Sequence, residues 1–114
     1  MATPDDVREL ALSLPETVEK SSYGTPGFRV KDKLFARIHQ DGVSLVLRCD
    51  RDLREAMHAA EPAKFYWTPH YDNYDAILVG LTEVDRDELG SLLEMAWFYV
   101  APSKVAAAYE ASLA

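Results

Sequence analysis

The positively charged side chains of this sequence are concentrated in one segment. Between Lys20 and Arg51 there are seven basic and three acidic residues, a net charge of +4, whereas the rest of the chain carries −11. Guanidinium groups form paired hydrogen bonds to phosphate, and aromatic rings beside them can stack on nucleic-acid bases. Exposed strands also carry Lys and Arg as solvated residues that protect a sheet edge, and this alternative stays open. The functional interpretation is a basic surface for nucleic acid, formed by Arg29, Lys31, Phe35, Arg37, His39 and Arg48.

A second group of candidate residues is aromatic. Five aromatic side chains lie within residues 66–74, namely Tyr66, Trp67, His70, Tyr71 and Tyr74. Two more, Tyr23 and Phe28, flank the turn signal at Gly24–Gly27. Aromatic residues grouped in loops are typical of binding grooves, although in small domains they also anchor cores and loops. The alternative prediction is a site for a small molecule or a protein partner, formed by Tyr23, Phe28, Trp67, His70, Tyr71 and Tyr74.

No arrangement of residues indicates catalysis. His70 has no serine or cysteine of a recognised nucleophile motif near it, and Asp72 and Asp75 alone do not define a proton relay. The same three residues form only a weak metal-binding pattern, and phosphate-loop, metalloprotease and Ca²⁺-loop motifs are absent. We therefore expect a non-enzymatic protein without a cofactor.

Composition limits the class of protein further. A chain of 114 residues that is 48% hydrophobic and 27% charged fits one globular domain, residues 1–114. No apolar run approaches the roughly 20 residues of a membrane span, and the start Thr3-Pro4-Asp5-Asp6 does not resemble a signal peptide. A single cysteine, Cys49, excludes an internal disulfide, and a net charge of −7 argues against coating nucleic acid through bulk charge. We expect a cytoplasmic monomer that does not enter membranes.

Helical spacing of apolar residues predicts the elements that position these candidates. Thr3 can cap a first helix that Pro15 stops, and Asp50 can cap a second helix over 51–60. Asp85 and Glu88 have the spacing of a capping box, which begins a long helix with apolar positions from 89 to 100. A short terminal helix is expected from Pro102 onward.

The alternation of apolar residues between Thr17 and Cys49 predicts consecutive antiparallel strands instead. Asp41-Gly42 predicts a tight hairpin turn between strands Leu34–His39 and Val43–Cys49, because these residue types adopt positive φ angles readily. Further strands are expected at 65–67 and 76–82, with a loop at 68–75 between them.

Strict alternation assigns each residue of this hairpin to one face of the sheet. The face toward the helices receives Leu34, Ala36, Ile38, Val43, Leu45, Leu47 and Cys49, so Cys49 is expected to be a buried, inert thiol. The opposite face receives Phe35, Arg37, His39, Ser44, Val46 and Arg48, with Arg29 and Lys31 beside them. The predicted fold class is α+β, an antiparallel β-sheet with N- and C-terminal helices packed on one face and the other face open.

Several segments resemble, in this order, the MmcQ/YjbR family of small bacterial proteins. They are residues 22–30 (SYGTPGFRV), 33–37 (KLFAR), 68–71 (TPHY) with Leu78-Val79, and 96–97 (AW) before 100–102 (VAP). The resemblance covers nearly the whole chain and implies a CyaY-like α+β fold. It also implies DNA binding through a double-wing motif, without a cofactor or an established reaction. Together with the basic segment, it makes non-enzymatic DNA binding the first hypothesis.

The CyaY-like fold implies a third possibility, because frataxin-type proteins bind iron through acidic residues of the first helix and strand. The corresponding region here contains Asp5, Asp6, Glu9, Glu16 and Glu19. Helix capping and ordinary solvation explain the same residues, so metal binding is the weaker alternative.

Overall fold

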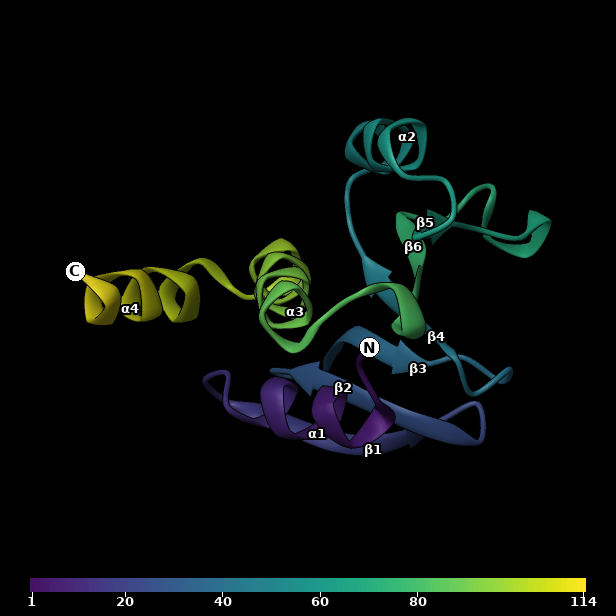
Figure 1. The fold of residues 1–114 in the computed structure, drawn as a ribbon. Helices are drawn as coiled ribbons and strands as arrows, with labels where there is room; N and C mark the ends of the chain where they lie inside the picture. Colours follow the sequence, from purple (N-terminus) through teal and green to yellow (C-terminus); the bar gives the residue numbers. More distant parts are fainter.

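A six-stranded antiparallel sheet organises the computed structural model, which describes residues 1–114 (Figure 1). Its strands lie in the order β1-β2-β3-β4-β6-β5 and comprise β1 (Thr17–Ser22), β2 (Thr25–Val30), β3 (Lys33–Ile38), β4 (Ser44–Arg48), β5 (Phe65–Tyr66) and β6 (Ala76–Gly80). The helices are α1 (Pro4–Leu12), α2 (Arg51–Ala60), α3 (Arg86–Val100) and α4 (Ser103–Leu113), with short 3₁₀ turns η1 (Pro69–Tyr71) and η2 (Leu81–Glu83). The α+β architecture expected from the sequence is confirmed.

The predicted helix caps are largely present. The Thr3 hydroxyl accepts a hydrogen bond from the Asp6 N–H, and the Asp6 carboxylate accepts one from the Thr3 N–H, which closes a capping box on α1. At α3 only half of the expected box forms. Asp85 accepts from the Glu88 N–H, but the Glu88 carboxylate binds Lys64 at 3.0 Å instead of returning to the cap. None of the four helices combines the length and the apolar character needed to cross a lipid bilayer.

The main hydrophobic core lies between one face of the sheet and the helices α1 and α3. Trp97 of α3 is fully buried there, and its indole N–H donates to the Pro15 carbonyl at 3.1 Å. The expected packing of N- and C-terminal helices on one face is therefore confirmed for α1 and α3. The last helix, α4, extends beyond α3 away from the sheet (Figure 1), and it contacts α3 through the rings of Tyr109, Trp97 and Phe98.

The opposite face of the sheet is covered at one end only. A second cluster of buried residues, Val46, Tyr71, Ala76 and Leu78, forms there, with Tyr66 and Trp67 packed against it. Because side chains alternate along β4 and β6, this cluster lies across the sheet from the main core. The segment 67–75, which contains η1 and is called the η1 loop below, thus covers β4 and β6 and leaves the surface over β2 and β3 open.

A β-bulge in β3 changes which of its residues face the core. Phe28 pairs with Ala36 while the next residue, Arg29, pairs with Leu34, so Phe35 is an extra residue in the ladder. Phe35 therefore points into the core with Ala36 and is fully buried. Leu34 turns to the opposite face. The predictions that Phe35 faces outward and Leu34 faces inward were wrong, because the bulge shifts the alternation by one residue.

The connection between β3 and β4 is longer than the two-residue turn that the sequence suggested. It spans residues 39–43, and of the expected pair only Gly42 has a positive φ angle, 74°. The Asp41 carboxylate instead accepts hydrogen bonds from the N–H groups of Val43 and Ser44. Val43 consequently precedes the strand and is exposed, which corrects its predicted inward position.

The bulge can be tested through stability. Phe35→Ala removes a fully buried ring, so we expect the free energy of unfolding to fall by about 3–5 kcal/mol. Val18→Ala, at an exposed position of β1, is the matched control and should cost about 0.5 kcal/mol or less. Urea denaturation followed by circular dichroism measures both. A small loss for Phe35→Ala would mean that the ring faces solvent.

Cys49 is buried as expected, and burial raises the pKa of its thiol from 9.0 to about 11. In the unfolded chain the thiol ionises near 9, whereas the folded protein retains the proton until about 11. Stability contributed by this group is therefore present below pH 9 and is lost as the pH rises toward 11. Urea denaturation below pH 9 and near pH 11 should show a larger loss for the wild type than for Cys49→Ala. Equal losses in the two proteins would contradict this assignment.

Candidate functional site

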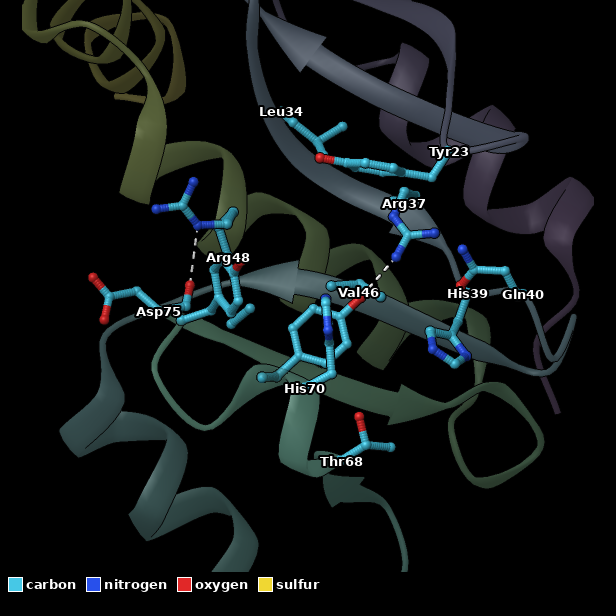
Figure 2. A pocket seen from close by; sticks show the side chains of 13 residues that line it. Tyr23, Leu34, Arg37, His39, Gln40, Val46, Arg48, Thr68, His70 and Asp75 are labelled. Carbon is cyan, nitrogen blue, oxygen red and sulfur yellow. Dashed lines mark hydrogen bonds between the residues drawn. The ribbon is translucent and has the colours of Figure 1, made fainter.

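A pocket of about 770 Å³ lies between β3 and the η1 loop, on the open part of the sheet face opposite the main core, which is called the second sheet face below (Figure 2). Residues from both predicted sites line it. From the basic group these are Arg37, His39 and Arg48, and from the aromatic group Tyr23, His70, Tyr71 and Tyr74, joined by Leu34, Gln40, Val46, Thr68, Asp75 and Ala76. Two sets of residues that the sequence suggested as rival sites therefore meet in one cavity.

Arg37 is the most deeply placed charge in this pocket. Its side chain is 5% exposed, and one terminal nitrogen donates to the Tyr71 hydroxyl at 2.7 Å. The other terminal nitrogen donates to the Thr25 hydroxyl at 3.1 Å and to the Ile38 carbonyl at 3.4 Å. All three partners are neutral, and Arg37 forms no ion pair. Since a guanidinium carries five N–H groups, two of them have no protein acceptor.

Arg48 provides a second positive charge at the opposite end of the pocket. Its Nε donates to the Asp75 carbonyl at 3.0 Å, and the terminal nitrogens make no hydrogen bond. The carboxylate of Asp75 is engaged by Arg51 at 2.8 Å and by the Tyr99 hydroxyl at 3.1 Å. These two hydrogen bonds hold the pKa of Asp75 below its usual range. Asp75 is the only acidic residue that lines the pocket, and Arg51 neutralises its carboxylate. Arg37 and Arg48 therefore give the pocket a net positive charge.

The η1 loop contributes an aromatic wall to the pocket. The imidazole of His70 stacks on Tyr74, with 5.6 Å between ring centroids and an angle of 24° between ring planes. His70 also meets Tyr71 edge-on at 4.8 Å. On the β3 side, His39 Nδ1 lies 3.4 Å from the Asp41 carboxylate. No hydrogen bond joins either histidine to a hydroxyl that could act as a nucleophile.

Tyr23 lies above Arg37 on the other side of the pocket (Figure 2). It occupies the two-residue turn between β1 and β2, where Tyr23 and Gly24 have φ angles of 54° and 79°. Positive φ at both central residues is the hairpin geometry that matches strand twist, and glycine at the second position adopts it without steric cost. The Tyr23 ring is 81% exposed, and its centroid lies 5.3 Å from the guanidinium carbon of Arg37.

Arg54 of α2 holds the η1 loop, although no pattern in the sequence singled this residue out. Its side chain is 3% exposed and donates hydrogen bonds to the backbone carbonyls of Tyr71, Asp72, Tyr74 and Ala76, at 2.8 to 3.2 Å. The guanidinium carbon also lies 4.1 Å from the centroid of the Trp67 ring. The one sequence signal for such a donor was the expected loop at 68–75, because the carbonyls of a segment without strand pairing need hydrogen-bond donors.

Other predicted site residues lie outside the pocket. Phe28 is buried in the main core, as is Phe35, so neither ring can contact a ligand in the pocket. The indole N–H of Trp67 donates to Asp72 at 3.1 Å, which makes this ring a loop anchor. Arg29 donates to the Asp32 carbonyl at 3.1 Å, and Lys31 pairs with Glu16 at 2.7 Å.

The acidic residues proposed for metal binding do not converge. Asp6 and Glu9 both pair with Arg86, Glu19 pairs with Arg8, and Glu16 pairs with Lys31, at N–O distances of 2.7 to 2.8 Å. No group of three or more His, Cys, Asp or Glu side chains in the structure is arranged to hold a metal ion. The residues thus act as ion-pair partners between α1, β1 and their neighbours.

The fold and the pocket define a small α+β protein built on one antiparallel sheet, with a ligand-sized cavity on the face that α1 and α3 leave free. A family model described as YjbR matches residues 12–98. The chain belongs to the YjbR family, as the resemblance in its sequence indicated.

Relatives and a solved structure agree with this assignment. The uncharacterized proteins Mb2600 of Mycobacterium bovis and Rv2570 of Mycobacterium tuberculosis are each 30% identical to the chain, and each match covers 98% of both sequences. The crystal structure of Deinococcus radiodurans protein DR2400, with family-model domain DUF419, has a TM-score of 0.75 at 27% identity. The match covers 91% of this chain and 82% of that chain. None of these descriptions specifies a ligand, so functional inference depends on the site.

The role of Arg54 predicts a large effect of its removal. Arg54→Met takes the donors away from four carbonyls while keeping much of the apolar volume, so we expect a loss of about 3 kcal/mol in the free energy of unfolding. Amide exchange across residues 68–75 should also accelerate. Arg51→Met removes an exposed arginine that pairs with Asp75, and as the control it should cost about 1 kcal/mol or less. Similar small losses for both variants in urea denaturation would show that Arg54 does not hold the loop.

Proposed function

We propose that this protein is a non-enzymatic binding module that holds a small acidic molecule, a carboxylate or a phosphate, in the pocket of the second sheet face. The observation that carries this proposal is Arg37. It is an almost completely buried guanidinium that lines a cavity of about 770 Å³ and has only neutral hydrogen-bond partners.

Charge complementarity supports an anionic ligand. A charge removed from water without a counter-charge is costly, and that cost falls when an anion enters the site. The two free N–H groups of Arg37 could then form charge-assisted hydrogen bonds, which are shorter and stronger than neutral ones. Arg48 adds a second guanidinium with free terminal nitrogens on the same cavity.

The dimensions of the site favour a small molecule over a duplex. Pockets for small ligands typically enclose about 300–1,000 Å³ and combine apolar walls with a few polar groups, as this one does. Arg37 is recessed beside Tyr23, whereas phosphates of a duplex contact side chains that project from a surface. DNA binding by this face stays a prediction of the family resemblance, and the titration below includes it.

Amide shifts and the free energy of unfolding together test whether Arg37 binds an anion or only supports the fold. We expect pyrophosphate or benzoate to shift the amide resonances of residues 37–40 and 68–75 in the wild type. Arg37→Met should abolish these shifts, and because it also removes three hydrogen bonds we expect the free energy of unfolding to fall by about 1–2 kcal/mol in a variant that still folds. Lys33→Met, on an exposed position of the same strand, is the matched control and should bind like the wild type.

Three outcomes distinguish the hypotheses. Shifts that depend on Arg37 but not on Lys33 support the pocket. The absence of shifts with every anion at millimolar concentration overturns the proposal. A short DNA duplex that binds in a salt-dependent manner through Arg48 and Arg29, while small anions do not bind, replaces it with the nucleic-acid interface.

A further inference from the structure

We propose that the acidic ligand also carries a flat aromatic ring, which is held between Tyr23 and the stacked pair His70–Tyr74. This inference rests on the proposed function and narrows its ligand class to aromatic carboxylates and aryl phosphates. It starts from the two walls of the pocket, which come from segments about fifty residues apart in the sequence and face the same cavity (Figure 2).

Both walls present aromatic surface to solvent. Tyr23 is 81% exposed and Tyr74 is 55% exposed, although both rings line the pocket. His70 and Tyr74 stack on each other nearly in parallel, at 24°, so a further planar ring can extend the stack. A planar ring is the ligand shape that covers such surfaces best, because aromatic rings prefer offset-stacked or edge-to-face contacts and lose water-exposed area on contact.

The backbone at Tyr23 strengthens this interpretation. Its φ angle of 54° lies in the left-handed region, where tyrosine is unfavourable and where asparagine or glycine is the usual hairpin residue. The ring gains no burial in the main core in return, and it lies over the guanidinium of Arg37. Glu16, Lys31 and Asp32 also have positive φ angles, so the exposed ring over the pocket, and not the backbone alone, is the feature that a planar ligand would use.

Polar groups at the base of the pocket place the acid beside the ring. The Tyr71 hydroxyl accepts a hydrogen bond from Arg37, so its own proton has no acceptor in the protein and is free for a ligand oxygen. Arg37 and Tyr71 thus offer donors to one anionic group directly below Tyr23. The arrangement recognises an acid group attached to, or one or two bonds from, a planar ring.

Matched pairs of ligands test this inference with the same protein samples. Titration calorimetry and amide shifts should show that benzoate binds roughly tenfold more tightly than cyclohexanecarboxylate, which has the same acid group on a non-planar ring. Phenyl phosphate should likewise bind roughly tenfold more tightly than inorganic phosphate. Whichever of benzoate and phenyl phosphate binds more tightly then shows whether the site prefers a carboxylate or a phosphate.

Tyr23→Asn is the decisive variant, because asparagine fits the turn and removes the ring. We expect it to fold and to lose the preference for benzoate over cyclohexanecarboxylate. Lys31→Asn is the matched control, since Lys31 occupies the corresponding position of the β2–β3 turn, with φ 48°, outside the pocket. It should keep the preference.

The outcomes separate this inference from the proposed function. Equal binding of the two members of each pair overturns the aromatic ligand but leaves an anion site. A ring preference that survives in Tyr23→Asn overturns the role of Tyr23. Failure of every ligand to bind overturns the anion site itself, and the aromatic ligand with it.

Discussion

The guanidinium of Arg54 is the interaction on which the second face of this protein depends. The chain between β5 and β6 makes almost no ladder hydrogen bonds of its own, yet its carbonyls are partly buried against α2. The Arg54 side chain donates to three of them and to the carbonyl of Ala76 at the start of β6, and it stacks on Trp67. Tyr71 and Tyr74, whose carbonyls accept these hydrogen bonds, also line the pocket. The position of the pocket wall therefore depends on Arg54, which lies on a neighbouring helix and does not line the pocket.

The two buried arginines of this molecule solve the same problem in different ways. Arg54 donates to four backbone carbonyls, so its charge is spread over a ring of peptide dipoles, although its buried Nε has no hydrogen-bond partner. Arg37 has fewer acceptors and an adjoining cavity. Equal burial therefore does not imply an equal role. The adjoining cavity distinguishes the two, because Arg37 lines a pocket that a ligand can enter, whereas Arg54 does not line it and supports the loop.

Much of the fold was predictable because local signals and the global arrangement agree. Thr3 and Asp50 cap the helices that they were expected to cap, and the apolar spacing of α3 matches the core that it enters. The bulge at Phe35 could not be read from the chain, because alternation is equally regular with either residue inward. Residues 34–38 contain only one charged side chain, so polarity gives little guidance to the position of an extra residue.

The site was predictable in its members more than in its geometry. Arg37, Arg48, His70 and Tyr23 were all singled out, but sequence separation hid that the basic strand and the aromatic loop share a cavity. Their meeting depends on the sheet order, in which β4 lies between β3 and β6 and brings residue 37 next to residue 71. Arg54 was hidden for another reason, since a charged residue on an amphipathic helix normally indicates the solvated side.

The bulge at Phe35 also links the evolution of the two faces. The alternation of inward and outward side chains shifts by one residue at the bulge. The same strand therefore supplies Leu34 and Arg37 to the pocket and Phe35 and Ala36 to the core. Deleting Phe35 would restore simple alternation and leave Leu34, Ala36 and Arg37 on their present faces, but the core would lose a fully buried ring. A one-residue insertion or deletion elsewhere in β3 would exchange inward and outward side chains beyond that point. Relatives that vary the pocket are therefore expected to do so by substitution at fixed strand length.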